Sequence, residues 1–204
     1  ANGVLLALGT AAEDGTARFR VVLETVSGMH GREQLHALQS ASLALVDGRG
    51  ADRVVLSLSD EPVQLRHATV EDADTVWPWR NHTRTRQYSL DKKKVTHAEH
   101  LAWWNHSLND LSRVLLIGSR CGLDVGVLRY DLGGKGEAVV SVYLDPDLFG
   151  LGLGIALLEA GNKWMMEHYR GVSELHAQIL PENEAARRAF EAAGFHFSRG
   201  VWIL

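Results

Sequence analysis

Hydrophobic and polar positions follow two different periods along this chain, and each period predicts one kind of element. Apolar residues spaced three and four apart predict amphipathic helices, whereas alternation at every second residue predicts strands with one buried face. From about residue 63 onward, the pattern predicts helices at 70–79, 97–108, 154–168 and 183–193, and strands at 63–67, 113–118, 125–131, 137–144, 174–180 and 195–203. This order of elements predicts an α+β fold with a mixed, mainly antiparallel sheet.

Local signals support two of these helices. Thr96 and Glu99 have the spacing of a capping box at the start of the helix at 97–108. In the helix at 154–168, we expect Gly161 to allow close packing on the sheet. In the helix at 97–108, the residues that share one face, and that we expect in the core, are Leu101, Trp104 and Leu108.

Residues 1–60 do not follow the pattern of the rest of the chain. Residues 32–46 predict an amphipathic helix, residues 47–50 break it, and residues 51–58 predict a second short helix. We therefore expect a small, mainly helical segment at 1–60, followed by a second domain that covers residues 61–204.

The phrase Leu45-Val46-Asp47-Gly48-Arg49-Gly50-Ala51-Asp52-Arg53-Val54 lies in the helical segment. It resembles the C-terminal tail of the UDP-sugar hydrolases of pseudaminic acid synthesis, which are enzymes of glycosyltransferase-B type. Only the tail is present. The resemblance therefore implies a remnant that carries no hydrolase chemistry and packs against the second domain.

A glycine-rich stretch between a predicted strand and a predicted helix carries the clearest chemistry. Gly150, Gly152 and Gly154 alternate there. Glycine lets the main chain approach a ligand without a Cβ in the way, and the first turn of a helix offers unpaired N–H groups. We therefore expect a cradle for a phosphate group, and a tight structural turn is the alternative. The spacing differs from that of dinucleotide-binding loops, and the Walker lysine is missing.

A second motif follows the predicted strand at 174–180. Asn183 has the position of a helix N-cap, and Gly194 ends the predicted helix before Phe195. In this order, the two motifs resemble the acyl-CoA site of the Gcn5-related N-acetyltransferases, the GNAT superfamily. That site combines a Q/R-x-x-G-x-G/A loop with an N-x-x-x-x-x-x-(Y/F)-x-x-x-G-F segment. The resemblance covers about residues 63–204 and implies the GNAT fold, with acetyl-CoA as the co-substrate.

The resemblance also assigns residues to the co-substrate. Leu144 would pair with the pantetheine arm, while Asn183 and Phe190 would contact the molecule from the neighbouring elements. Phe149 stands where the family usually has Gln or Arg, so phosphate binding would depend on backbone donors more than on a side-chain charge. The residues that would hold the pyrophosphate are Phe149, Gly150, Leu151, Gly152, Leu153, Gly154 and Ile155.

The stretch from Trp79 to Trp104 resembles the acceptor region of the UDP-4-amino-sugar N-acetyltransferases of the pseudaminic acid pathway. Arginine can bind a diphosphate through two hydrogen bonds, and aromatic rings can stack on uracil or on a sugar. The alternative is that Trp103 or Trp104 caps the core while the arginines are surface charges. The implied acceptor-binding residues are Trp79, Arg80, Asn81, Arg86, Tyr88 and Trp103.

The candidate catalytic residues lie on two predicted strands. Many GNAT enzymes have, at the position of Phe190, a Tyr that protonates the departing CoA thiolate, and phenylalanine cannot do this. Tyr143 and Ser141 share one face of the strand before the glycine-rich stretch, so we expect them to contact the reacting centre. His176 is the candidate base, because Gln178 on the same face cannot ionise. Water in place of either group, and a packing role for Tyr143, are the alternatives.

Composition narrows the class of protein. The chain has 204 residues, with 21 Lys and Arg against 25 Asp and Glu, which argues against a nucleic-acid-binding protein. No apolar run approaches the length of a membrane span and no signal pattern is present, so we expect no membrane association. Cys121, expected in a hairpin turn before Gly122, is the only cysteine, which favours a cytoplasmic location. A chain that begins with Ala1 is expected to be processed or a fragment.

The expected function is transfer of acetyl from acetyl-CoA to the amine of a nucleotide sugar, a UDP-linked 4-amino-4,6-dideoxy sugar. A homodimer is a possible assembly. No metal site is expected, because His97, Glu99 and His100 lack a further ligand at a suitable spacing. The alternatives are acetylation of protein N-termini, as by ribosomal-protein acetyltransferases, and a non-catalytic acyl-CoA-binding module.

Overall fold

The computed structural model describes residues 48–198 and 200–204. The chain divides into two compact units, residues 1–50 and residues 51–204, and the second unit contains the sheet. The helix predicted at 32–46 lies outside the described residues.

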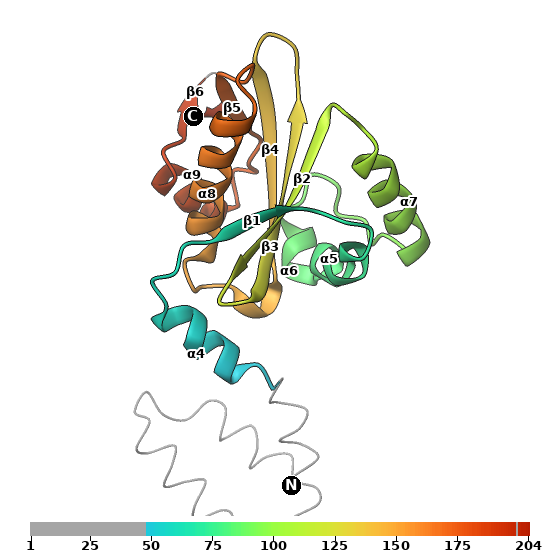
Figure 1. Cartoon of the computed structure of the whole chain (residues 1–204), viewed down its shortest axis with the longest axis vertical. Helices are drawn as coiled ribbons and strands as arrows, with labels where there is room; N and C mark the ends of the chain where they lie inside the picture. Colours follow the sequence, from blue (N-terminus) through green and yellow to red (C-terminus); the bar gives the residue numbers. More distant parts are fainter. Residues whose placement is uncertain (1–47, 199) are drawn as a thin grey trace, which may run out of the picture. The chain divides into compact units, whose positions relative to one another are not determined.

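A seven-stranded sheet organises the second unit, with the strand order β1-β2-β3-β4-β5-β7-β6 (Figure 1). Its strands are β1 (Gln64–His67), β2 (Arg113–Arg120), β3 (Leu123–Leu132), β4 (Glu137–Leu144), β5 (Glu174–Ala177), β6 (His196–Ser198) and β7 (Val201–Ile203). Among these strands, β4 and β5 form the parallel pair and all other neighbours are antiparallel. The predicted mixed, mainly antiparallel sheet is therefore confirmed.

The described helices include every helix predicted after residue 50. They are α4 (Gly50–Leu58), α5 (Asp72–Asn81), α6 (Thr83–Gln87), α7 (His97–Leu108), α8 (Leu153–His168) and α9 (Glu184–Ala192), with a 3-10 turn η1 (Pro146–Leu148). The short helix α6 was not predicted. The strand predicted at 195–203 is instead the hairpin of β6 and β7, because the chain turns at Gly200 with φ +91°.

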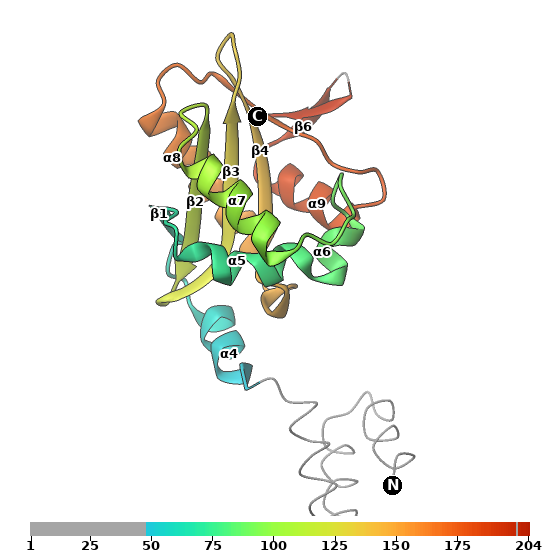
Figure 2. The same ribbon diagram turned by 90° about the vertical axis from the view of Figure 1, so that its right-hand side faces the viewer.

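Helices cover both faces of the sheet (Figures 1 and 2). Helices α8 and α9 lie against one face, and α5 and α7 lie against the other. The first face has the larger apolar core, which includes Leu128, Val140 and Leu157. The core of the second face includes Trp79 and Trp104. Successive residues of a strand therefore serve two different cores, as alternation requires.

Several local predictions are confirmed. Thr96 and Glu99 form the predicted capping box at the start of α7. Cys121 and Gly122 make the turn between β2 and β3, with φ values of +53° and +74°. A Cβ at Gly161 would overlap the side chains of β3, so this glycine does allow α8 to lie close to the sheet.

Helix α4 packs within the second unit, beside the connection from β4 to α8. Leu56 is 1% exposed and lies in an apolar cluster with Val125, Leu148 and Leu153. This side chain lies beneath the connection from β4 to α8, in the compact unit that covers residues 51–204. The boundary expected at residue 61 stays a prediction. Within the described ranges, no helix is both long enough and apolar enough to span a membrane.

Candidate active site

The parallel strands β4 and β5 separate from each other part of the way along the sheet. They are paired only over Glu137–Val139 of β4 and Glu174–His176 of β5. Strand β4 continues to Leu144, whereas β5 ends at Ala177, short of the strand predicted at 174–180. Residues 140–144 therefore have no β5 partner along one edge of their backbone.

The hydrogen bonds to β3 determine which backbone groups of β4 face that unpaired edge. The N–H of Asp145 donates to the C=O of Val125 at 3.0 Å, and Tyr143 lies opposite Val127 in the same register. In an antiparallel pair such bonded positions alternate, so the odd-numbered residues of β4 bond to β3. The residues whose N–H and C=O point the other way are Val140, Val142 and Leu144. This row is about 13 Å long, at about 3.3 Å per residue.

The glycine-rich stretch lies directly beyond this row. Gly150 and Gly152 have φ values of +90° and +74°, and a Cβ at either position would project into open space. In the described part of the chain, the N–H groups of residues 150–154 have no backbone acceptor. Helix α8 begins at Leu153 and adds the positive end of its dipole. The geometry suits an anion, as predicted for the loop, because a side chain at either glycine would fill the space an anion needs.

Two side chains from the start of α6 contact Phe149. The guanidinium carbon of Arg84 lies 4.8 Å from the centroid of the Phe149 ring. The ring of His82 meets it edge-on, with the centroids 6.3 Å apart. Neither residue was predicted from the sequence, since nothing in their spacing shows that they approach a loop more than sixty residues away.

The two residues predicted to contact the co-substrate from α9 both have structural contacts. The Oδ1 of Asn183 accepts a hydrogen bond from the N–H of Ala186 at 3.1 Å, which confirms the predicted N-cap. Phe190 is 4% exposed, and its ring packs edge-on against Phe195. Their contacts with the co-substrate remain predictions.

Tyr143 and Ser141 lie on the face of β4 that α5 and α7 cover. Tyr143 is partly buried against the core of that face. The Oγ of Ser141 accepts a hydrogen bond from Nη2 of Arg129 at 3.2 Å. The guanidinium carbons of Arg129 and Arg113 lie 5.8 and 5.7 Å from the ring centroid of Trp103. These side chains thus form a mixed aromatic and cationic surface beside β4.

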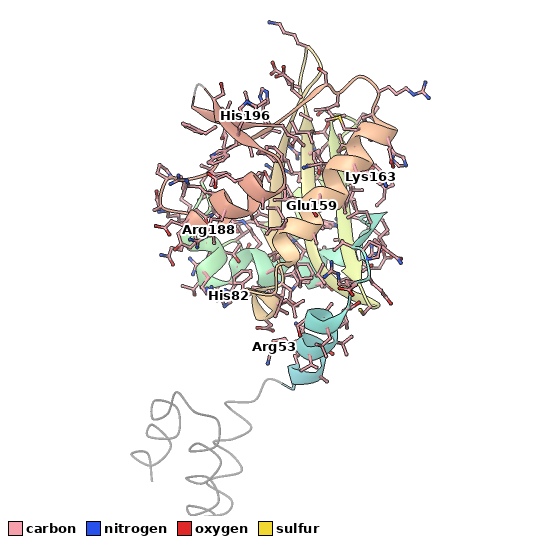
Figure 3. All side chains as sticks on the ribbon, turned by 90° about the vertical axis from the view of Figure 1, so that its left-hand side faces the viewer. Arg53, His82, Glu159, Lys163, Arg188 and His196 are labelled. Carbon is pink, nitrogen blue, oxygen red and sulfur yellow. The ribbon has the colours of Figure 1, made fainter. Side chains whose placement is uncertain are left out.

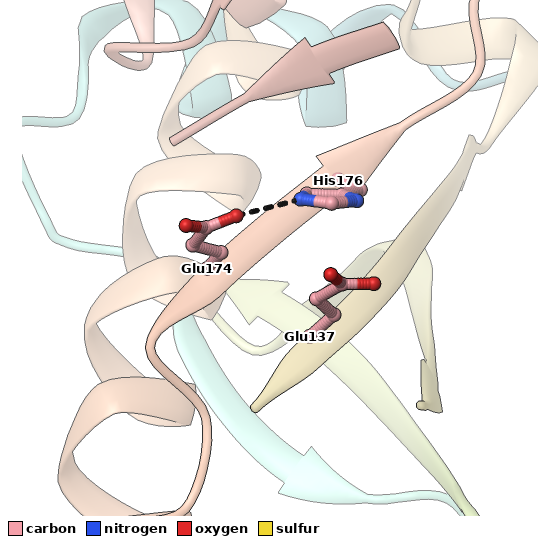
Figure 4. Close-up of side chains that lie close together, drawn as sticks. All are labelled: Glu137, Glu174 and His176. Carbon is pink, nitrogen blue, oxygen red and sulfur yellow. Dashed lines mark hydrogen bonds and ion pairs between the residues drawn. The ribbon is translucent and has the colours of Figure 1, made fainter. Parts of the chain in front are cut away.

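His176 lies on the same face, opposite Val139, where β4 and β5 are still paired. Its Nε2 is 3.1 Å from a carboxylate oxygen of Glu174 (Figure 4). One atom from each of Glu137, Glu174 and His176 can be chosen so that all three lie within 4.8 Å of one another. This spacing is compatible with a cation, and the sequence did not reveal it because the residues come from two strands.

His97, Glu99 and His100 each have contacts of their own. The Nε2 of His97 lies 2.7 Å from Oδ1 of Asp74, and the carboxylate of Glu99 is used in the capping box. His100 is buried against Trp104, and burial lowers the pKa of its imidazole.

The predicted acceptor residues of α5 and α6 contact the segment that connects α6 to α7. Arg80 donates to the C=O of Asp91 at 2.8 Å, and Arg86 donates to the C=O of Lys92 at 3.2 Å. Asn81 bonds both the N–H and the C=O of Val95. These side chains hold residues 82–95 in place. Their acceptor contacts, like those of Tyr88, remain predictions.

The remaining predicted aromatic residues differ in exposure. Trp79 is 7% exposed and belongs to the core, whereas Tyr88 is 37% exposed. A cavity of about 230 Å³ lies elsewhere, at the β1 and β2 edge of the sheet, with Arg113 and Tyr169 in its lining. Strand β3 separates this cavity from the edge of β4 that β5 leaves unpaired.

Many solved structures are similar to this chain. AAC(6')-Ib in complex with paromomycin and acetyl-CoA has a TM-score of 0.63 and 19% identity, covering 70% of this chain and 93% of that one. Spermidine N-acetyltransferase from Vibrio cholerae with CoA and spermine has a TM-score of 0.61 and 13% identity, covering 70% and 92%. A domain from Methanocaldococcus jannaschii has a TM-score of 0.58 and 21% identity, covering 71% and 97%.

The search of curated proteins gave no significant match. Residues 63–196 match the family described as Acetyltransferase (GNAT) domain, which is more than half of the chain. This range includes the parted strands, the glycine cradle and α9. The chain therefore belongs to the GNAT family of acetyl-CoA-dependent N-acetyltransferases.

Proposed function

We propose that this chain transfers the acetyl group of acetyl-CoA to the 4-amine of a UDP-linked 4-amino-4,6-dideoxy sugar. This reaction belongs to pathways of the pseudaminic acid type, which supply surface or flagellar glycans. The observation that carries the acetyl-transfer part is the separation of β4 from β5 directly before the glycine cradle. A phosphate in the cradle leaves the attached arm free to run along the unpaired backbone groups of Leu144 and Val142.

The chemistry requires a nucleophile, a polarised carbonyl and two proton transfers. The acceptor nitrogen attacks the thioester carbon, so a C–N bond forms and the C–S bond breaks. Backbone N–H groups of β4 that face the gap can stabilise the developing negative charge on the carbonyl oxygen. His176, directly or through water, takes the proton from the amine. Tyr143 or water then gives a proton to the departing thiolate.

The acceptor part of the proposal is supported by the resemblance of residues 79–104 and by the surface beside β4. Trp103, Arg113 and Arg129 offer a ring and two guanidinium groups on the face that carries Tyr143. The two arginines also share Asp131, which keeps the guanidinium groups in place. A nucleotide with a diphosphate would find both a stacking surface and positive charge there.

A second candidate acceptor is a small polycationic amine. The specific observation is the carboxylate pair of Glu137 and Glu174 around His176, exposed on the acceptor side (Figure 4). Carboxylates attract ammonium groups, and they would repel a diphosphate. Two of the similar structures are complexes with such amines, paromomycin and spermine.

A screen of acceptors separates the candidates. Release of CoA from acetyl-CoA is followed with a UDP-4-amino-4,6-dideoxy sugar, spermine, paromomycin, and peptides with free N-termini. The proposal expects the UDP-sugar to have the highest kcat/KM. Preference for spermine or paromomycin would replace it with the second candidate, and preference for a peptide would indicate N-terminal acetylation. If no amine releases CoA although acetyl-CoA binds, the chain is a binding module instead.

A further inference from the structure

We propose that Arg84 of α6 is a phosphate ligand for acetyl-CoA, held over the glycine cradle by the ring of Phe149. The inference rests on the proposed function, since it assumes that acetyl-CoA occupies the cradle. It adds a cationic ligand from a part of the chain that precedes the cradle by more than sixty residues. In this chain, α6 would then supply the positive charge, and the glycine-rich stretch before α8 would supply the backbone donors.

The cradle has no cation of its own. From Phe149 to Asn162 the sequence contains neither Lys nor Arg. The first cation of α8 is Lys163, and ten residues of helix place it about 15 Å from the first turn. The backbone donors and the helix dipole together would therefore offer a pyrophosphate only about half a positive elementary charge.

Arg84 is placed to supply the missing charge. Its guanidinium carbon lies 4.8 Å from the ring centroid of Phe149, the residue before Gly150. Among the described residues, no carboxylate lies within ion-pair distance of it, and its side chain is exposed. Its neighbours Arg80 and Arg86 are different, because both donate to backbone carbonyls. Arg84 is thus the exposed arginine of this segment, and within the described ranges no backbone carbonyl occupies its donors, so they can reach a ligand.

The position of the Arg84 guanidinium over the Phe149 ring suits phosphate binding. A guanidinium over an aromatic face uses its π surface for that contact, while its N–H donors stay in the plane of the group. These donors can form two parallel hydrogen bonds to phosphate oxygens. His82 meets the same ring edge-on, and in Figure 3 it lies on the side of Glu159 that is away from Lys163, toward the start of α8. Phe149 therefore acts as a support for Arg84, which explains an apolar residue at the mouth of an anion site.

Calorimetric titration with CoA and with 3′-dephospho-CoA tests the proposal. Arg84→Gln is expected to weaken CoA binding about tenfold, the effect of one exposed charged hydrogen-bonding group. Equal weakening for both ligands places Arg84 on the pyrophosphate, and weakening for CoA alone places it on the 3′-phosphate. Arg170→Gln is the matched control, because Arg170 is also exposed but follows α8 at the far end of the helix. Its CoA affinity should equal that of the wild type.

Relocating the charge separates a ligand role from a structural one. In the Arg84→Gln background, Phe149→Arg returns a guanidinium to the cradle and is expected to recover most of the lost affinity. Unchanged affinity in Arg84→Gln overturns the proposal. So does a loss that Phe149→Arg does not recover while circular dichroism shows both variants folded. A wild-type protein that binds neither CoA nor acetyl-CoA contradicts the proposed function itself, which is a different result from an unaffected Arg84→Gln.

Discussion

The two faces of the sheet are built in different ways. On the face of α8 and α9 the core is apolar, and the site at its end is made of backbone, with glycines and unpaired N–H groups. On the face of α5 and α7 the apolar core is smaller, and it is surrounded by hydrogen-bonded charged groups such as Asp72, Arg113 and Asp131. The first face can bind a ligand mainly through its backbone. Ligand binding on the second face would depend on several side chains that are held in place by one another.

This difference separates a general site from a specific one. A backbone cradle recognises phosphate and an extended arm, which every acetyl-CoA molecule presents. Side chains from α7, β2, β3, β4 and β5 lie on the other face, and we expect their substitution to change the choice of acceptor without disturbing the cradle. Variants on the two faces should therefore fail in different measurements.

The largest effect is expected from Gly152→Val on the cradle side. A β-branched side chain at φ +74° is strained and projects into the space that a phosphate would occupy. We expect acetyl-CoA affinity to fall more than about 100-fold, which is about 2.7 kcal/mol, in a calorimetric titration.

Gly200→Val is the matched control for that variant. Gly200 has φ +91° and open space around its missing Cβ, but it lies in the β6 and β7 turn. It should show the same loss of stability from strain while binding acetyl-CoA normally. Near-normal binding by Gly152→Val would show that the stretch is a turn and not a cradle.

The sequence predicted local features better than contacts between residues that lie far apart along the chain. The cradle and the capping box could be predicted because their residues are consecutive, and Gly161 because helical spacing points it at the sheet. The cluster of His176 with Glu137 and the contact of Arg84 with Phe149 could not be predicted, since strand pairing and helix packing bring these residues together. Sequence spacing likewise did not show that Arg80 and Arg86 would be used by backbone carbonyls.

A smaller effect is expected from Asp72→Asn on the acceptor side. Arg66 donates to both carboxylate oxygens of Asp72 at 2.7 Å, and the N–H of Thr69 donates at 2.7 Å. Burial alone would raise the pKa of this carboxyl, but the hydrogen bonds from Arg66 and Thr69 outweigh it, and the pKa is lowered. We expect a loss of about 1–3 kcal/mol in the free energy of unfolding, measured with urea at neutral pH.

The pH dependence checks the cause of that loss. A carboxyl with a lowered folded pKa adds stability above its unfolded pKa, and this stability disappears as the pH falls through the folded value. The difference between wild type and Asp72→Asn should therefore shrink below about pH 4. Asp124→Asn is the control, because Asp124 is partly exposed and 3.3 Å from Arg66, so it should cost under about 0.5 kcal/mol.

Tyr143→Phe tests whether the acceptor face takes part in the reaction. If the hydroxyl protonates the thiolate, kcat should fall about tenfold, or about 1.4 kcal/mol, while KM for acetyl-CoA stays nearly the same. Tyr130→Phe is the control, since Tyr130 is fully buried on the opposite face and its hydroxyl has no partner among the described residues. An unchanged kcat in Tyr143→Phe would leave water as the acid and make Tyr143 a packing residue.

The smallest effect concerns His100, a buried titratable group on the acceptor face. Burial is the main cause of its lowered pKa, and the positive charges of His97 and Arg80 act in the same direction, against a hydrogen bond to the Ala73 backbone and the charge of Asp74. The folded protein therefore disfavours the protonated imidazole, and its Nε2 lacks a partner in the described ranges.

The direction of the pH effect follows from that lowered pKa. Between the folded and the unfolded pKa, the unfolded chain binds more protons, so stability is fully present above about pH 6.5 and is lost as the pH falls. One group can contribute at most about 1.4 kcal/mol per pH unit. In urea unfolding at pH 7.5 and pH 5.5, the fall in the free energy of unfolding on acidification should be smaller for His100→Gln than for the wild type. If the free energy of unfolding falls equally in His100→Gln and in the wild type, protonation of His100 is not the cause of the loss at low pH. The acid sensitivity then comes from other groups.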